Sequence, residues 1–471
     1  MKLLPILFAS ALGALLASCS VGPNYHRPAA SVPGTWTATS GAANTNATRL
    51  AEWWKQLNDP TLDRLIERAL QANFDLKAAA ARVRAARALR GAAISDFLPT
   101  IDANASYSTA RRSANSLNSA VKSLDTDTYQ AGFDASWEID IFGGRRRALE
   151  AATAQLQAIE ENQRDVQVSL LAEVARNYVE LRGTQQRLAI ARRNLDAQTE
   201  VLNLTQLLLD KGLATQLDVA QAQTVLAATK SAMPTLETTL QQDNHRLCTL
   251  LGVAPGSLDG DLAAEAPIPP APPEIPLGLP SDLLRQRPDI RASERQLAAA
   301  TANIGVAQAE LLPKFFLNGS GGFQSLHASN LISPASEFWS AGPSVQWRLL
   351  EYPRLKAAVN AQTAQQEEAL AQFNQTVLLA LEDVENAMVA WTKERDRYQS
   401  LNEAVQANRQ SLDLAKQLYQ NGLGEFLNVL LAERTLYQAE DALVQSQSTM
   451  TENAVALYKA LGGGWTTTSK P

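Results

Sequence analysis

Apolar residues recur every seven positions along two stretches of the chain. They are Val174, Leu181, Leu188, Leu195, Leu202 and Leu209 in the first stretch, and Val219, Leu226, Met233, Leu240 and Leu247 in the second. A strict seven-residue spacing predicts helices that pack as a coiled coil. An ordinary helix of a globular protein would show a broader apolar face. We therefore expect long helices at about 143–211 and 215–252, joined by a turn at Gly212.

The same pattern is present twice, which makes the chain an internal duplication. Leu98-Pro99 recurs as Leu312-Pro313 at an offset of 214 residues, and from Gly132 onward the offset is 210. Further pairs at 210 are Trp137 and Trp347, Phe142 and Tyr352, Gly212 and Gly422, and Leu251-Gly252 and Leu461-Gly462. The second copy is thus four residues shorter, a difference that falls between its two expected strands. It predicts long helices at about 353–421 and 425–461.

Four shorter segments alternate apolar and polar residues with a period of two. In the second of them, Phe133, Ala135 and Trp137 alternate with Asp134 and Ser136. We expect strands at about 98–110, 128–141, 313–323 and 338–350. Alternation over ~9–11 residues is typical of strands in a membrane barrel, with apolar residues outside and polar residues in the lumen. A half-buried sheet of a water-soluble protein alternates in the same way, so that alternative stays open.

Four strands are too few to close a barrel in lipid, since the smallest known barrels have about eight. An open sheet edge in hydrocarbon would leave backbone groups unpaired, which is costly. A membrane location would therefore require other copies of the chain, and eight strands from two copies or twelve from three would both close the barrel. Four aromatic residues are placed where an interfacial girdle is expected, namely Tyr107, Trp137, Trp339 and Trp347.

The N-terminus has the composition of a targeting segment. Lys2 precedes an apolar run that is too short to span a membrane and that ends in Leu16-Ala17-Ser18-Cys19. Small residues before a cysteine resemble a bacterial lipobox, so we expect residues 1–18 to be a signal peptide and Cys19 to carry a covalent lipid. Ser20 resembles the signal for delivery to the outer membrane. An ordinary secretory signal is the alternative. No later stretch reaches 18 consecutive apolar residues, so the mature chain is expected to have no transmembrane helix.

These patterns divide the chain into six parts. Residues 254–280 hold eight of the 21 prolines, so we expect a stiff extended linker there without helix. The parts are a signal peptide (1–18), a lipidated extended segment (19–58), the first repeat (59–253), the linker (254–280), the second repeat (281–462) and a C-terminal tail (463–471).

Charge and motif content exclude several classes of protein. The chain has 42 Lys+Arg against 48 Asp+Glu and a net charge of −6, which provides no basic field for nucleic acid. Two cysteines form no disulfide framework or zinc pattern, and Cys248 is expected to be a small buried apolar residue. His26, His245 and His327 are scattered, and no nucleophile-elbow, zincin, P-loop or dinucleotide motif is present. We expect no enzyme activity, no metal and no cofactor besides the lipid on Cys19.

The assembled motifs resemble the outer-membrane factor family, the TolC-like exit ducts of tripartite efflux systems, and most closely its lipoprotein branch typified by OprM and NodT. The stretches that carry the resemblance are Cys19 to Tyr25, Phe142 to Arg146, Arg287 to Arg291, Ala300 to Ala309, Leu312-Pro313 and Trp339 to Pro343. The resemblance implies a mainly helical fold with a membrane β-barrel. Three copies would form a twelve-stranded barrel continued by a periplasmic α-helical tunnel, so the resemblance decides trimer over dimer.

The resemblance also assigns roles to the two helix reversals. In the family these tips meet a periplasmic adaptor, which implies adaptor-contacting turns at Gly212, Leu213, Gly422 and Leu423. Asp218 and Tyr419 match a carboxylate–phenol pair that latches the closed tip, although Tyr419 also fits as a simple heptad residue.

The second tip departs from the family pattern. Asn428 and Leu431 stand where relatives carry constriction aspartates, and Gly424 stands in place of a latch arginine. Glu425 is the only acidic residue of that tip, so the gate is expected to be less acidic and more apolar than in TolC-like members.

Two functional hypotheses follow. The first is a passive trimeric outer-membrane channel, coupled through a periplasmic adaptor (membrane fusion) protein to an inner-membrane pump of the RND type. The second is a lipid-anchored periplasmic coiled-coil adaptor or scaffold without a pore. The alternating strands, present once in each repeat, favour the channel.

Overall fold

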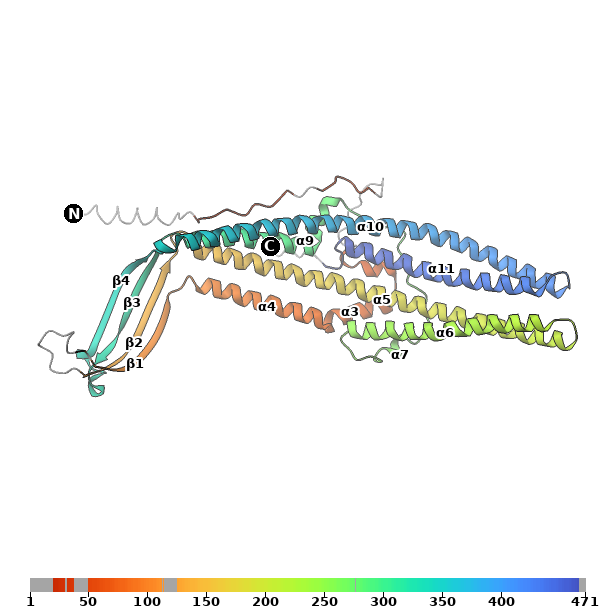
Figure 1. The fold of residues 1–471 in the computed structure, drawn as a ribbon, viewed down its shortest axis with the longest axis horizontal. Coiled ribbons are helices and arrows are strands. Elements are labelled where there is room, and N and C mark those ends of the chain that lie inside the picture. The colour runs from red at the N-terminus through yellow and green to blue at the C-terminus, as the bar shows by residue number, and fades with distance from the viewer. Residues whose placement is uncertain are drawn as a thin grey trace. The chain divides into compact units, whose positions relative to one another are not determined.

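The computed structural model describes residues 20–29, 32–37, 50–111, 113, 125–275 and 277–465. Helices make up most of it, together with one small sheet (Figure 1). In chain order the main elements are α3 (Pro60–Ala72), α4 (Phe74–Ser95), β1 (Thr100–Arg111), β2 (Asp125–Ile139), α5 (Gly144–Asp210), α6 (Gln216–Leu250), α7 (Asp259–Leu262), α8 (Leu283–Gln286), α9 (Pro288–Ala309), β3 (Lys314–Ser325), β4 (Glu337–Gln346), α10 (Tyr352–Gln420) and α11 (Phe426–Ala460).

The duplication is visible in the bounds of the elements. α9 and β3 begin and end 214 residues after α4 and β1, and α11 begins and ends 210 residues after α6. α5 has 67 residues and α10 has 69. Each of these long helices reverses into its shorter partner, α6 or α11, as an antiparallel hairpin (Figure 1). The described part of each repeat is therefore a helix, a strand pair and a long helical hairpin.

The four strands form one antiparallel sheet in the order β1-β2-β3-β4. β2 and β3 join the two repeats, with Gly132 opposite Gly322 and Ile139 opposite Phe315. Adding a Cβ to Gly322 would bring it 2.3 Å from the Ala131 carbonyl oxygen, so glycine permits this close approach. β1 and β4 each have one edge that faces no other strand in the described part of the chain.

Contacts divide the chain into two compact units. One comprises Met1–Ala29, Arg82–Ile159 and Ala292–Phe373, and it contains the sheet. The other comprises Ala30–Ala81, Glu160–Arg291 and Asn374–Pro471, and it contains both helix reversals.

The apolar core of the second unit follows the heptad positions. Val174, Leu181 and Leu188 of α5 are buried, as is Leu247 of α6. Trp53 stacks on Tyr458 of α11 with ring centroids 5.3 Å apart. Nearer the tips, Ala222, Phe426 and Leu430 form a smaller cluster on which Val201, Leu202 and Tyr419 pack. The heptads therefore do pack the hairpins together, although Leu195, Leu202 and Leu209 remain partly exposed.

Two local expectations are corrected by the structure. Residues 254–280 contain one helical turn, α7, because between Pro255 and Pro267 the chain is free of proline and can bury Leu258 and Leu262. β4 ends at Gln346 rather than at about 350, because the chain turns there into a 3₁₀ turn at Leu349–Glu351. Trp347 and Leu349 consequently lie beyond the strand.

None of the helices within the described ranges is long and apolar enough to cross a membrane.

Candidate functional site

The sheet has one apolar and one polar face. Ile101, Phe133, Trp339 and Val345 share the apolar face, and each is more than 60% exposed to solvent in the single chain. Such a contiguous exposed apolar surface marks an interaction site in the assembled protein. On the polar face, a shallow hollow of about 500 Å³ is lined by residues that include Asp102, Asp134, Ser136, Asn318, Ser320 and Ser340.

Cross-strand hydrogen bonds organise the polar face. Asn318 accepts a bond from the Ser136 hydroxyl at 2.9 Å and donates through Nδ2 to Ser344 Oγ at 2.7 Å. Its repeat equivalent Asn104 donates in the same way to the carboxylate of Asp134. Asp102 lies directly opposite Asp134 in the register. This surface is polar and acidic, as expected for the water-facing side of a channel.

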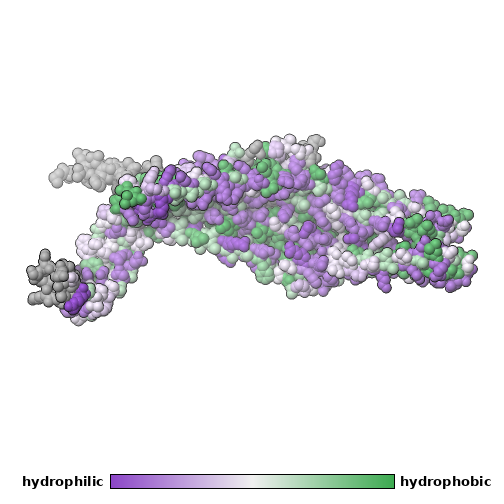
Figure 2. All heavy atoms as spheres, in the orientation of Figure 1, coloured by the Kyte–Doolittle hydropathy of each residue, from purple (hydrophilic) through white to green (hydrophobic). Residues whose placement is uncertain are grey.

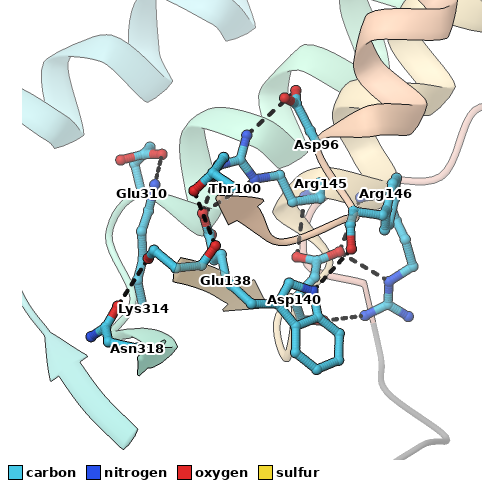
Figure 3. A network of polar contacts seen from close by, with 12 residues as sticks. Asp96, Thr100, Glu138, Asp140, Arg145, Arg146, Glu310, Lys314 and Asn318 are labelled. Carbon is cyan, nitrogen blue, oxygen red and sulfur yellow. Dashed lines mark hydrogen bonds and ion pairs between the residues drawn. The ribbon is translucent and has the colours of Figure 1, made fainter. Parts of the chain in front are cut away.

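An ionic network fastens the sheet to the long helix α5 (Figure 3). Arg145 bridges Glu138 at 2.7 Å and Asp96 at 3.5 Å, and so links α5, the end of β2 and the turn after α4. Asp140 accepts the backbone N–H groups of Arg145 and Arg146 and thereby caps the start of α5. The network therefore fixes the direction in which the helix leaves the strand.

A cavity of about 110 Å³ lies beside this network, at the junction of strands and helices. Its lining includes Phe142, Pro313 and the ion pair of Lys314 Nζ with Glu310 Oε1, which are 2.5 Å apart. The charged groups drawn in Figure 3 form ion pairs with one another. We therefore interpret this junction of strands and helices as a structural joint.

The segment after the expected lipid site is docked against the same joint. Arg147, which is buried, donates to the carbonyl oxygens of Val21 and Gly22 at 3.0 and 3.2 Å and to Asn24 Oδ1 at 2.7 Å. The backbone N–H of Val21 donates to the Phe142 carbonyl at 3.0 Å. Cys19 itself lies outside the described residues, as does the expected signal peptide.

Farther along this segment, Tyr25 donates its hydroxyl proton to Glu294 at 3.0 Å. Burial, reinforced by the charge of Glu294, raises the pKa of Tyr25 to about 12, so the phenol stays neutral as a donor. No local sequence pattern indicates these contacts of Arg147 and Tyr25, since their partners lie more than a hundred residues away.

Both helix reversals use the same glycine geometry. Gly212 and Gly422 have φ of +75° and +72°, which favours glycine. In each turn the glycine N–H bonds back to the residue three before it, and the next N–H, of Leu213 or Leu423, bonds five residues back at 2.8 or 2.9 Å. This pair of bonds is a Schellman motif, which satisfies carbonyls at the helix end.

The two leucines project into solvent and are about three-quarters exposed. Figure 2 shows hydrophobic residues gathered at the hairpin ends in the same region. The adaptor-contacting role of these turns remains a prediction.

The residues expected at the gate are only partly brought together. Asp218 is the N3 residue of a capping box, and its Oδ2 accepts the backbone N–H and the hydroxyl of Thr215 at 2.7 and 2.8 Å. Tyr419 packs against Phe426 with ring centroids 5.4 Å apart. Burial, followed by the nearby charge of Asp218, raises the pKa of Tyr419, but within the described single chain no hydrogen bond joins the two side chains.

The second tip lacks the corresponding cap. Glu425 is the N-cap of α11 and makes no side-chain capping bond, and Asn428 is exposed at the position equivalent to Asp218. The two tips therefore share a turn but differ in how firmly the following helix begins.

Three carboxylates, Glu180 of α5, Asp243 of α6 and Glu452 of α11, lie near enough to influence one another electrostatically. Burial raises the pKa of Asp243 and of Glu452 to about 7, and the charge of Glu180 adds to both shifts. Thr184 donates to Asp243 at 3.5 Å. Heptad reading could not find this cluster, because its members lie on three separate helices.

The described residues contain no group of three or more His, Cys, Asp or Glu side chains that could hold a metal ion. Cys248 is buried, and its thiol lies 3.8 Å from Asn244 Oδ1.

Comparison with known proteins identifies relatives over almost the whole chain. A family model described as outer membrane efflux protein matches residues 65–253 and 279–463. The pyoverdine export outer membrane protein OpmQ of Pseudomonas aeruginosa is 35% identical over 457 residues, which are 96% of this chain and 95% of the relative. Nodulation protein T of Rhizobium leguminosarum is 30% identical over 460 residues, 97% of each chain.

Solved structures agree with these relatives. The outer-membrane channel OprN superposes with a TM-score of 0.89 at 39% identity, covering 95% of this chain and 100% of that one. The open-state MtrE outer membrane channel of Neisseria gonorrhoeae gives a TM-score of 0.85 at 30% identity, covering 95% and 99%. OpmQ is an export protein, and OprN and MtrE are outer-membrane channels, which supports the channel over the pore-less scaffold. The chain belongs to the outer membrane efflux protein family and is an outer-membrane efflux channel.

Proposed function

We propose that the protein works as a passive trimeric exit duct whose three copies close a twelve-stranded barrel. The observation that carries this proposal is the four-stranded sheet, with its exposed apolar face, its polar face and two outer edges that face no other strand among the described residues. In lipid every backbone polar group must be paired, so an open four-stranded sheet cannot stand alone there. Other copies of the chain supply the missing strands, and the apolar face then contacts lipid while the polar face lines the lumen.

A lipid on Cys19 anchors the N-terminus in this proposal. The docking of residues 21–24 on Arg147 and on the carbonyl of Phe142 supports it, because it holds the start of the mature chain at the end of β2. One acyl-bearing residue gives limited membrane affinity by itself, so the anchor acts together with the barrel.

The hairpin tips are the end that couples to the rest of the efflux system. Leu213 and Leu423 offer exposed apolar contacts for a periplasmic adaptor protein, which links the duct to an inner-membrane pump of the RND type. Asp218, Tyr419, Glu425 and Asn428 form the gate region. Since the second tip carries only Glu425 as an acid, the constriction is less acidic than a ring of aspartates would be.

The test is the mass, lipid content and conductance of the mature protein purified from outer membranes in mild detergent. We expect a lipid-modified trimer, about three times the chain mass, that forms ion-conducting pores in planar bilayers. A monomer that leaves the membrane once the lipid is removed would overturn the proposal, because the strands would then form a water-soluble sheet.

A further inference from the structure

The strand pairings of the two repeats match residue for residue at the offsets of 214 and 210. In β1–β2, Thr100 lies opposite Ser136, and in β3–β4, Lys314 lies opposite Gln346, which is the equivalent pair. The same mapping converts the bond from Asn104 to Asp134 into the bond from Asn318 to Ser344. The repeats therefore share one strand register as well as one fold.

A contact outside the sheet follows the same mapping. The Asn73 side chain donates to the Leu250 carbonyl at 2.9 Å, and the equivalent Arg287 donates to the Ala460 carbonyl at 3.1 Å. This agreement extends to both compact units, so the offsets hold along the repeat rather than for one hairpin alone.

The β2–β3 pair is the place where a first repeat meets a second repeat. Closing a barrel from several copies requires the reverse pair, in which β4 of one copy meets β1 of the next. If the copies continue the repeat symmetry, the known β2–β3 register dictates the unknown one. Ala135 opposite Gly319 becomes Val345 opposite Ala105, and Ser136 opposite Asn318 becomes Gln346 opposite Asn104.

We propose that β4 of one copy pairs antiparallel with β1 of the next copy in this register, from Trp339 opposite Arg111 to Gln346 opposite Asn104. The proposal rests on the barrel assembly proposed above and names the contact that builds it. Along the interface the other opposed pairs are Ser344 with Ser106, Pro343 with Tyr107, Gly342 with Ser108, Ala341 with Thr109 and Ser340 with Ala110.

The register keeps the two faces of the sheet continuous across the joint. Val345 and Ala105 both lie on the apolar face, while Gln346 and Asn104 both lie on the polar face. A slip by one residue would place apolar side chains beside polar ones, because successive side chains point to opposite faces. Slips by two keep the faces but break the repeat symmetry, so they are the alternatives that the test must separate.

Side-chain contacts within the chain also have counterparts at the joint. Phe142 packs near Phe315 with ring centroids 6.4 Å apart, and the mapping converts this contact into Tyr352 against Ile101 of the next copy. Both of these side chains are more than half exposed in the single chain. The Ser136–Asn318 hydrogen bond becomes a bond between the Gln346 and Asn104 side chains, which extends the polar row around the lumen.

Pairs of cysteines test the register in the full-length, lipid-modified protein with Cys248→Ala as background. Directly opposed residues have Cβ atoms about 4.5–5.5 Å apart, close enough for a disulfide after a small adjustment, whereas diagonal neighbours are about 7–8 Å apart. The in-register pairs are Val345→Cys with Ala105→Cys and Gln346→Cys with Asn104→Cys. Neighbouring positions alternate between the wider and the narrower spacing, so using both pairs includes the closer one.

Matched controls come from the chain itself. Ala135→Cys with Gly319→Cys is the equivalent pair within one chain, and a Cβ at Gly319 has open space, its nearest neighbour being the Ser340 carbonyl oxygen at 3.8 Å. Val345→Cys with Ala103→Cys or with Tyr107→Cys reports a slip by two in either direction. Each single cysteine variant shows the background.

On non-reducing gels we expect covalent trimers and dimers from at least one in-register pair, at ten-fold or more above the slipped pairs, with trimers reverting to monomers on reduction. Trimers that cross-link at a slipped pair, or at neither in-register pair while the Ala135–Gly319 control closes, would overturn the register and leave the proposed channel standing. A monomeric protein that forms only the control disulfide would overturn the proposed function and the register together.

Discussion

The indole N–H of Trp137 donates to the carbonyl oxygen of Phe97 at 2.9 Å, and thereby ties the end of β2 to the turn that follows α4. Trp347 repeats the bond with the Leu311 carbonyl at 3.1 Å. The sequence pattern predicts that these tryptophans belong to an aromatic girdle at the membrane interface. In the structure both indole N–H groups donate within the chain. Each hydrogen bond therefore links the end of a strand to the turn that follows a helix.

Trp137→Phe keeps an aromatic ring but removes the donor and leaves the Phe97 carbonyl without its partner. We expect a loss of about 0.5–1.5 kcal/mol in stability, measured as a lower SDS concentration or temperature for trimer dissociation. Trp339→Phe is the control, because that indole has no hydrogen-bond partner among the residues that the structure describes. Equal effects of the two changes would show that the Trp137–Phe97 hydrogen bond does not contribute to stability.

Arginine on the apolar face tests the lipid contact. If Phe133 or Val345 faces the middle of the bilayer, substitution by Arg costs about 2–4 kcal/mol. Ser320→Arg on the polar face should cost much less, since it points to the lumen near Asp134. Yields of folded trimer in membranes give the comparison, and unchanged stability of both apolar-face variants would contradict the assigned faces.

Gly305→Ala tests the docking of the N-terminal segment. A Cβ there would lie 2.8 Å from the Val21 carbonyl oxygen and 2.8 Å from Arg147 Cγ, so residues 20–24 must shift. We expect faster hydrogen exchange at the Val21 amide and a loss of thermal stability. Gly91, the equivalent glycine in the first repeat, has nothing within 4 Å of such a Cβ, so Gly91→Ala should be neutral or stabilising. Slow exchange in both variants would show that the docking tolerates the methyl group.

Substitution of the N-cap residue should destabilise α6 more than α11, because only the N-cap of α6 makes a side-chain capping bond. Thr215→Ala breaks the capping box with Asp218 and should cost about 0.5–2 kcal/mol. Glu425→Ala removes no side-chain capping bond and should change stability little. Hydrogen exchange in the first turns of α6 and α11 checks this, and a larger effect at α11 would reverse the assignment.

A test of the proposed latch between Asp218 and Tyr419 needs a substitution that leaves the capping box of Thr215 and Asp218 intact. Asp218→Ala removes both the capping box and any latch, whereas Tyr419→Phe removes only the hydroxyl and keeps the contact with Phe426. A latch predicts that both substitutions raise single-channel conductance. Unchanged conductance in Tyr419→Phe would assign Tyr419 to packing and Asp218 to capping.

The buried acids predict a dependence of stability on pH. Because burial raises the pKa of Asp243 and Glu452 from their usual values to about 7, the folded state binds protons more tightly than the unfolded state. Stability should therefore fall as pH rises between about 4 and 7, with Glu180 opposing ionisation and Arg176 partly favouring it at Glu452. We expect a melting temperature several degrees higher at pH 5.5 than at pH 8, and a smaller difference in Asp243→Asn and Glu452→Gln. A pH dependence that both variants retain in full would assign it to other groups.

The helices, the strands and their duplication can be predicted from the sequence, because they follow from local periodicity. Heptads located the long helices, alternation located the strands, and Gly212 and Gly422 located the reversals. The regular offsets between matching residues, 214 and then 210, already implied two equivalent halves. The resemblance carried by a few motifs added the family, which the relatives bear out.

Contacts between residues far apart in the sequence became known from the fold. It placed β2 beside β3, brought Arg147 to residues 21–24, and engaged Asp218 with Thr215 in a cap. It also gathered Glu180, Asp243 and Glu452 from three helices. Periodicity specifies which face of an element is apolar, but it does not specify the partner of that face. The partner depends on how the chain folds back over more than a hundred residues, and so on contacts that no local pattern contains.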